Sequence, residues 1–256
     1  MLFRSLGTAQ FAALSSTQFG ALTTGQLSKL ETADLRAVTT GALGGLTSAQ
    51  VAALASDAVG AMSTAQIAAF STGQIAGLTT GDMIALTSAQ VAALNSAQAG
   101  ALSTAQIAAI ETADIKSITS TALRNLSSDQ LDAFTSDQLR ALSTGQVNAL
   151  TTAQVNTLGT ADLNSLSTAQ FANLSSGQVQ ALTSTQLSNL ATDNLNALGT
   201  AQFAALTSSQ FGSLTTGQLA NLQTADLRAV TTNALGGLTS AQVAALASDG
   251  VGAMST

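Results

Sequence analysis

The chain has 256 residues, of which 46% are hydrophobic, 3% aromatic and 8% charged, with a formal net charge of −6. This composition is too apolar for a disordered chain, and the seven Lys and Arg residues form no basic cluster, so we expect no nucleic-acid partner. Cys and His are absent, which argues against a zinc or copper site and excludes a disulfide framework. Ser, Thr and Gln interrupt every apolar stretch, so the sequence predicts no membrane span.

An eight-residue repeat begins at the N-terminus and continues to the last residue. Counted from Met1, the chain forms 32 octads without an insertion or deletion. Position six is a large apolar residue in all 32 octads, and position three is one in all but the octad of Ala99. Position eight is always Ser or Thr, and position two is Gln in most octads. An unbroken register of this kind is typical of a stack in which every layer packs on the next.

Each octad in turn predicts one short helix and a corner. In residues 47–54, Thr47 is followed three residues later by Gln50, which is the capping-box pattern of a helix N-terminus. Val51 and Leu54 are three residues apart and therefore lie on one helix face. Alone, a helix of one or two turns is unstable. We therefore expect the octads to stack so that positions three and six form a continuous core.

Two other regular structures fit the octad poorly. Eight residues of a continuous helix turn about 800°, so the apolar pair would drift around the helix and form no stripe. In a long flat strand, positions three and six would face opposite sides. The predicted fold class is thus an all-α solenoid of very short helices, and a β-solenoid with 16-residue coils is the alternative.

Position two carries a second pattern. Gln is replaced by an acidic or amide residue at Asp34, Asp82, Asp114, Asp162, Asn194 and Asp226, and every gap between these is a multiple of 16. Ala or Gly replaces it at Ala42, Ala58, Ala122, Ala234 and Gly250, all in the other class of octads. This alternation predicts that two octads, or 16 residues, form one layer.

Two long segments of the chain are near-duplicates. Residues 8–64 recur at residues 200–256 with eight differences in 57 positions, at an offset of 192 residues, which is 24 octads. We therefore expect one continuous solenoid over residues 1–256 with a 192-residue higher-order repeat. Met1 and Leu2 replace the small residue and Gln of other octads, which suggests a fragment of a longer array.

No residue pattern predicts a catalytic, cofactor-binding or metal site, and we expect neither an enzyme nor a cofactor. Glu31 with Asp34, and Glu111 with Asp114, are spaced like paired carboxylates. A basic residue follows each pair at the same offset, which favours a surface charge cluster. The acidic residues at position two are interpreted as first-turn residues of helices. The Ser/Thr column at position eight is largely explained by capping and corners, with glycan or ice binding as its functional alternative.

The octads "LTSAQVAAL", "LTTAQVNTL" and "LSTAQIAAI" resemble the Ser/Thr-rich octapeptide arrays of giant bacterial secreted or surface-attached, adhesin-like proteins. The resemblance implies a cell-surface or extracellular structural segment, a spacer or a fibre-forming repeat that self-associates with neighbouring copies. A repetitive surface that binds glycan, ice or another surface through Ser, Thr and Gln columns is the alternative. The shorter pattern also resembles mesothelin-type superhelices and TAL effector repeats, but the octads lack the period and basic face for DNA binding.

Overall fold

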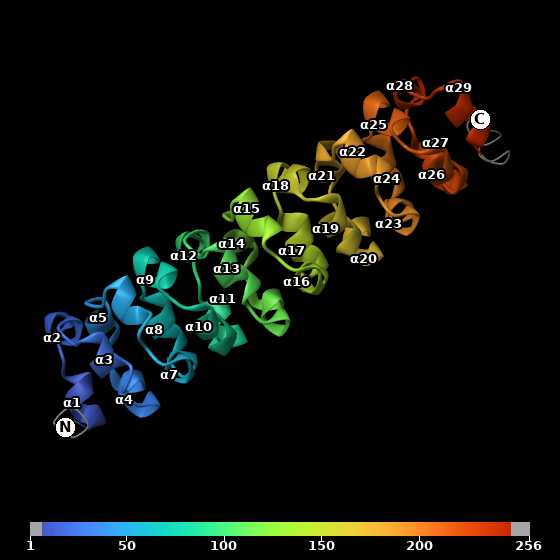
Figure 1. Cartoon of the computed structure of the whole chain (residues 1–256). Helices are drawn as coiled ribbons and strands as arrows, with labels where there is room; N and C mark the ends of the chain where they lie inside the picture. The colour runs from blue at the N-terminus through green and yellow to red at the C-terminus, as the bar shows by residue number, and fades with distance from the viewer. Residues whose placement is uncertain (1–6, 247–256) are drawn as a thin grey trace. The chain divides into compact units, whose positions relative to one another are not determined.

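A computed structural model describes residues 7–246. These residues form thirty short helices and no β-strand, so the fold is an all-α solenoid and the β-solenoid alternative is wrong. The chain divides into two compact units, an N-terminal unit Met1–Phe134 and a C-terminal unit Thr135–Thr256. Each unit is a stack of helices of the same kind and is described by itself (Figure 1).

The N-terminal unit contains sixteen of the helices. They are α1 Thr8–Ala12, α2 Ser16–Gly20, α3 Thr24–Leu27, α4 Thr32–Ala37, α5 Thr40–Leu43, α6 Ser48–Val51, α7 Ser56–Gly60, α8 Thr64–Ala68, α9 Thr72–Ala76, α10 Thr80–Ala85, α11 Ser88–Ala92, α12 Ser96–Gly100, α13 Thr104–Ala108, the 3₁₀-helix η2 Thr112–Ser117, α14 Ser120–Arg124 and α15 Ser128–Asp132.

The C-terminal unit contains the other fourteen. They are α16 Ser136–Ala141, α17 Thr144–Ala149, α18 Thr152–Thr157, α19 Thr160–Ser165, α20 Thr168–Ala172, α21 Ser176–Ala181, α22 Ser184–Ser188, α23 Thr192–Asn196, α24 Thr200–Ala204, α25 Ser208–Gly212, α26 Thr216–Ala220, α27 Thr224–Ala229, α28 Thr232–Leu235 and α29 Ser240–Ala245.

Every described helix begins at position eight, directly after an N-cap residue at position seven. In the octad of α11, the Thr87 hydroxyl accepts the Gln90 N–H and the Gln90 Oε1 accepts the Thr87 N–H, so the predicted capping box is confirmed. Helix α10 ends at Ala85, and its C-cap residue Leu86, with ψ of 138°, is followed by Thr87 with ψ of 160°. Two consecutive extended residues therefore form the corner between one helix and the next.

Positions three and six form the core of both units, as predicted. Val51, Ile67 and Phe203 at position three are 0% exposed, and Leu54 at position six is 5% exposed. Ala99, the small residue at position three, lines an apolar cavity of about 20 Å³ with Leu102, Ile107 and other side chains. The small side chain of Ala99, where other octads have a large apolar residue, therefore leaves a packing gap in the core.

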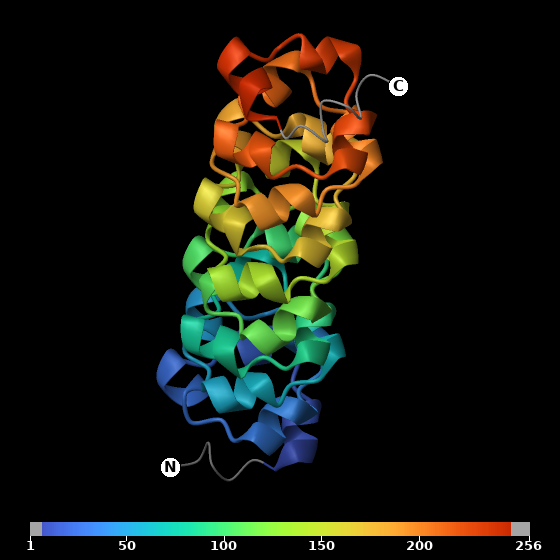
Figure 2. The same cartoon turned by 90° about the vertical axis from the view of Figure 1, so that its right-hand side faces the viewer.

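The predicted layer of two octads is wrong. Helices in extensive contact within the described units lie three octads apart, as α7 and α10 do in the N-terminal unit and α24 and α27 in the C-terminal unit (Figures 1 and 2). Position-two glutamines reach the octad four earlier, as described below. One superhelical turn therefore contains between three and four octads. The physical reason is the corner: two extended residues turn the chain by a quarter to a third of a circle, and two such corners cannot close a layer.

Glycines allow the closest approaches between consecutive turns. A Cβ on Gly45 would collide with the backbone carbonyl of Ser16, and a Cβ on Gly20 would collide with that of Gly45. The same contacts recur between α25 and α28, where Gly237 meets Ser208 and Gly212 meets Gly237. Two helices three octads apart therefore touch through their backbones at these points.

Candidate functional site

The repeated polar feature of both units is a buried glutamine at octad position two. Gln66 is 3% exposed. Its Oε1 accepts the Ser63 N–H at 2.8 Å, which completes the capping box of its own helix. Its Nε2 donates to the carbonyls of Leu35 at 2.9 Å and Val38 at 2.7 Å, at the C-terminal end of α4. One amide therefore caps the N-terminus of one helix and the C-terminus of a helix four octads earlier.

We call such a residue an interlayer glutamine. In every case its Nε2 lies 2.6–2.9 Å from the carbonyl 28 residues earlier. A second carbonyl 30 or 31 residues earlier accepts as well. Those that bond to carbonyls within the N-terminal unit are Gln50, Gln66, Gln74, Gln90, Gln98, Gln106 and Gln130, and those that bond to carbonyls within the C-terminal unit are Gln170, Gln178, Gln186, Gln202, Gln210, Gln218 and Gln242.

These hydrogen bonds join consecutive turns of the solenoid. A neutral hydrogen bond contributes about 1 kcal/mol, and a buried carbonyl without a donor costs about 1–3 kcal/mol. The carbonyls that these glutamines reach, such as those of Leu43 and Leu46, lie at the end of a short helix, where no further helical turn supplies a donor. The repeated Gln is therefore the residue that lets many very short helices be buried together.

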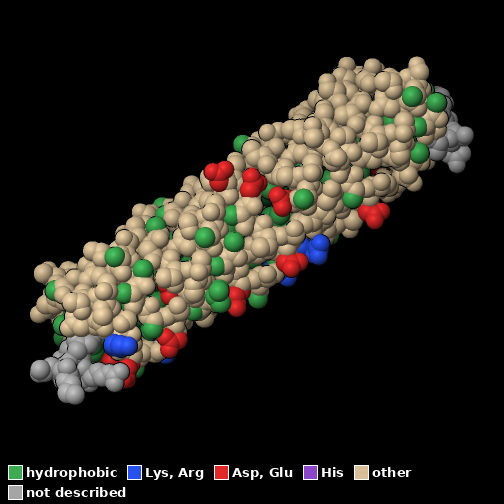
Figure 3. All heavy atoms as spheres, in the orientation of Figure 1, with side chains coloured by type: hydrophobic (Ala, Val, Ile, Leu, Met, Phe, Trp, Pro, Cys, Tyr) green, Lys and Arg blue, Asp and Glu red, His purple; other side chains and the backbone are tan. Residues whose placement is uncertain are grey.

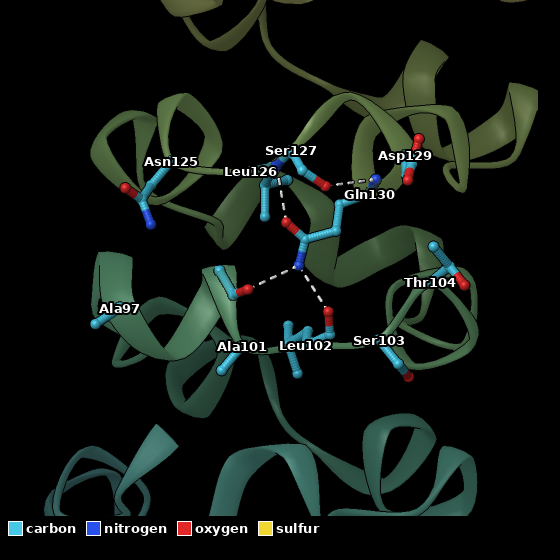
Figure 4. A pocket seen from close by; sticks show the side chains of 11 residues that line it. Ala97, Ala101, Leu102, Ser103, Thr104, Asn125, Leu126, Ser127, Asp129 and Gln130 are labelled. Atoms are coloured by element: carbon cyan, nitrogen blue, oxygen red, sulfur yellow. Dashed lines mark hydrogen bonds between the residues drawn. The ribbon is translucent and has the colours of Figure 1, made fainter. Parts of the chain in front are cut away.

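Gln130 lies at the edge of an open groove in the N-terminal unit (Figure 4). The groove lies between two segments of consecutive turns and is lined by Ala97, Gly100, Ala101, Leu102, Ser103, Thr104, Asn125, Leu126, Ser127, Asp129 and Gln130. The Asn125 Nδ2 donates to the Ser96 carbonyl at 2.7 Å beside Gly100. The groove thus offers hydroxyl groups and the Asp129 carboxylate, but its Gln130 amide is already hydrogen-bonded to the backbone.

Asp residues at position two form a different contact. The Asp82 Oδ2 accepts the Thr79 N–H at 2.7 Å, while its buried Oδ1 has no hydrogen-bond partner. The Asp114 Oδ1 accepts the Ser88 hydroxyl three helices earlier. A carboxylate cannot donate to the carbonyls that an interlayer glutamine reaches. These octads therefore lack the amide connection to the turn before.

Burial changes the titration of three of these aspartates. It raises the pKa of the Asp226 carboxyl. Burial also raises the pKa of Asp34, and the negative charge of Glu31 raises it further. At Asp162 burial raises the pKa, while the hydrogen bond from the Gly159 N–H opposes this. The charged forms are thus disfavoured inside the stack.

Each of the two predicted carboxylate pairs lies at the start of one helix, with its members three residues apart. Glu31 is the exposed N-cap residue of α4, and Asp34 lies in its first turn. Glu111 is the exposed N-cap residue of η2, whereas Asp114 is buried and bonded to Ser88. The carboxylates of the second pair therefore face different surroundings, one in solvent and one in the stack.

Position four, which varies freely in sequence, carries a contact that the pattern did not predict. In the C-terminal unit, the Nδ2 of Asn148, Asn156 and Asn164 donates to a carbonyl 25 residues later at 2.6–2.9 Å. Asn196 makes the same bond to Asn221. The repetition of Asn at eight-residue spacing was the sequence signal from which this contact could have been predicted.

The Ser and Thr hydroxyls at position eight lie mostly at the surface, as at Thr64 and Thr104.

The surface is largely uncharged, and hydrophobic side chains are scattered over the visible face (Figure 3). Arg140 and Asp137 form an ion pair at 4.0 Å. Among residues 7–246, no group of three His, Cys, Asp or Glu side chains is placed to hold a metal ion. In the same part of the chain, no helix has both the length and the apolar character to cross a membrane.

Short capped helices joined by interlayer glutamines define an all-α solenoid repeat protein. The family model described as the ALTTAQ repeat matches consecutive, overlapping segments that together cover residues 3–256: 3–30, 27–64, 53–80, 59–88, 75–109, 107–144, 137–160, 157–192, 187–224 and 219–256. The chain therefore belongs to the ALTTAQ repeat family. Among curated proteins, no relative matched the chain.

Proposed function

We propose that this repetitive segment is a structural spacer or fibre-forming part of a large extracellular bacterial protein, without enzymatic activity. The observation that carries the proposal is the interlayer glutamine, which recurs in both units and donates to the carbonyl 28 residues earlier and to a second carbonyl 30 or 31 residues earlier. The buried polar side chains are thus used to connect consecutive turns of the solenoid. Mechanical continuity is the function that this arrangement supports best.

The extracellular and bacterial setting rests on the resemblance of the octads to adhesin-like arrays. It is tested by protease treatment of intact cells that express the full-length gene product. Loss of the repeat from intact cells supports surface exposure, and protection until lysis contradicts it.

The spacer role is tested by measuring how dimension depends on the number of octads. Because residues 200–256 duplicate residues 8–64, residues 65–256 can follow Thr256 again in register. Small-angle scattering at low concentration compares this longer chain with the original. A spacer predicts a maximum dimension that rises in proportion to octad number. A dimension that grows only as the cube root of length contradicts the proposal.

A second candidate function is a repetitive binding surface for glycan or ice. Two observations favour it: the exposed position-eight hydroxyls, and the open groove with Ser103, Thr104, Ser127 and Asp129. Many weak contacts on a regular array add up to useful affinity. Polysaccharide retention and ice-recrystallisation assays test it, and no effect in either removes it.

A further inference from the structure

Asp82, in the first turn of α10, is a buried carboxylate inside the N-terminal unit. Its side chain is 0% exposed. Neither α10 nor the helices α7 and α13 that pack on it contain Lys or Arg. The other acidic residue of these helices, Asp57 in α7, is exposed. A buried charge is costly unless a group of opposite charge compensates it, and the side chains of these three helices supply none.

The register of the octads shows where the carboxylate of Asp82 points. In the next octad, the Gln90 Oε1 accepts the N–H of its N-cap residue at 2.7 Å, and the Gln90 Nε2 faces the turn before. The Asp82 Oδ2 accepts the Thr79 N–H, also at 2.7 Å, and thus takes the place of the glutamine Oε1. The Asp82 Oδ1 therefore takes the place of the Nε2. It is buried and has no hydrogen-bond partner among the described residues.

The carbonyls that correspond to this position are those of Leu54 and Val51, which precede Asp82 by 28 and 31 residues. They lie at and just after the C-terminal end of α6. The Val51 carbonyl accepts the Leu54 N–H at 3.0 Å, whereas the Leu54 carbonyl accepts no N–H or O–H from residues 7–246. In the next octad, the Met62 carbonyl accepts the Gln90 amide at 2.8 Å. A carboxylate cannot donate, so only acceptor oxygens meet at Asp82.

The hydroxyl of Ser56 in α7 lies beside this group of oxygens. A Cβ on Gly81, the residue before Asp82, would lie 3.1 Å from the Ser56 Oγ. In the octad of η2 the corresponding hydroxyl, that of Ser88, donates to the Asp114 Oδ1. No such bond joins Ser56 to Asp82, whose Oδ1 has no partner among residues 7–246. The same residue type at position two thus has a protein donor at Asp114 and none at Asp82.

We propose that the Asp82 Oδ1 and the carbonyls of Val51 and Leu54 bind a monovalent metal cation such as Na⁺. The Ser56 hydroxyl supplies a further oxygen. An all-oxygen set suits a hard cation, and carbonyls at the C-terminal end of a helix attract positive charge. A single carboxylate balances one positive charge, whereas a divalent ion would leave a surplus charge in a buried site.

The cation connects the two turns as an interlayer glutamine does elsewhere in the unit. The site contains one carboxylate, so it differs from the clusters of three acidic, His or Cys side chains that are absent from residues 7–246. Its other ligands are two main-chain carbonyls and a common hydroxyl, and no residue pattern in the sequence distinguishes them. The site is independent of the proposed spacer function.

The test compares the whole chain with two matched variants. Asp82→Gln completes the interlayer glutamine at this position and removes the carboxylate. Asp114→Gln makes the same change where the carboxylate already has the Ser88 donor. Amide hydrogen exchange is measured by mass spectrometry in choline chloride and in NaCl of equal ionic strength. The segments compared are 48–60 and 80–86, at the site, and 168–188, which contains no acidic residue.

For the original chain and for Asp114→Gln, we expect Na⁺ to slow exchange about tenfold in segments 48–60 and 80–86 and not in 168–188. Asp82→Gln should exchange slowly in both salts. Equal exchange of the original chain in both salts overturns the site and leaves a water molecule between the oxygens as the explanation. A Na⁺ response that persists in Asp82→Gln, or that is equally large in 168–188, overturns it as well. A stronger effect of CaCl₂ at the same ionic strength overturns the monovalent charge. None of these outcomes affects the scattering test of the spacer.

Discussion

The two copies of the duplicated block have nearly the same sequence and different neighbours. Gln50 donates to Gly20 and Leu22, and Gln242 donates to Gly212 and Leu214 at the same distances of 2.8 and 2.7 Å. Where both partners lie inside the block, the structure is therefore repeated. Where one partner lies outside it, the copies differ: Gln18 is exposed, and Gln210 is 5% exposed.

This comparison separates what an octad does alone from what it does in a stack. The capping box forms in both copies, because all of its atoms belong to one octad. The interlayer contact forms only where the octad four earlier is present. The local helix is thus specified by eight residues, and its burial by about four times as many.

The largest expected effect comes from changing Gln210 to glutamate, compared with the same change at its counterpart Gln18 in the first copy. Gln210→Glu leaves the capping box but sets a carboxylate against the carbonyls of Gln180 and Leu182, and we expect the free energy of unfolding to fall by about 3 kcal/mol. Gln18→Glu should change it by less than about 0.5 kcal/mol, because that side chain is exposed. Urea denaturation followed by circular dichroism measures both.

The pH dependence of Gln210→Glu gives a second check. Burial beside two carbonyls should raise the pKa of the new carboxyl above its ordinary value. The folded state then binds a proton more tightly than the unfolded state, so the variant loses stability as the pH rises through that range. Equal losses at Gln18 and Gln210 would mean that the interlayer hydrogen bonds contribute nothing.

Truncating a core valine tests the apolar side of the same comparison. Val51→Ala removes two methyl groups from a fully buried side chain, and we expect a loss of about 2–3 kcal/mol. Val243→Ala removes them from a side chain that is 48% exposed, and we expect a loss of less than about 1 kcal/mol. Thermal unfolding measures the loss of stability in both variants. A larger loss at Val243 than at Val51 would contradict the described burial of these two side chains.

A glycine substitution should affect the two copies equally. Gly45→Ala and Gly237→Ala each direct a methyl group at a backbone carbonyl of the helix three octads earlier, which lies within the same copy. We expect both to cost about 2 kcal/mol. Gly41→Ala is the control, because its Cβ would meet nothing within 4 Å and alanine favours the helix. Urea midpoints that differ between the copies would show that the contact depends on more distant residues.

Much of this fold follows from the octad itself. The capping pair at positions seven and two, and the apolar pair at positions three and six, are local signals, and they predict helix starts and core residues correctly. The number of octads in a turn does not follow. It depends on the angle of a corner made of two extended residues, such as Leu86 and Thr87, and no residue type at the corner encodes that angle.

The interlayer contacts were missed for a related reason. The sequence explains Gln66 completely as half of a capping box, and its second partner lies 28 residues away in an octad like any other. At position four, Asn148 and Asn156 look interchangeable with Ala, although their amides bond to the next turn. In such repeats, a recurring Gln or Asn whose amide has a donor left over after its local hydrogen bonds is the sequence signal for a contact between turns.

The smallest expected effect concerns one difference between the copies. Burial raises the pKa of both Asp34 and its counterpart Asp226, but only Asp34 has an acidic neighbour, because Glu31 is replaced by Gln223 in the second copy. Glu31→Gln makes the first copy match the second at this position. We expect the pKa of Asp34 to fall, since one source of repulsion is removed while its burial remains.

The sign of the accompanying stability change follows from linkage. A carboxyl whose pKa in the folded state lies above its unfolded value of 3.8 makes the protein less stable as the pH rises through the interval between the two. Glu31→Gln should make this decline smaller without abolishing it. NMR titration of the Asp34 carboxyl, with denaturation at several pH values, measures both quantities. An unchanged pKa would assign the whole shift to burial, which the neighbouring turns of the solenoid control.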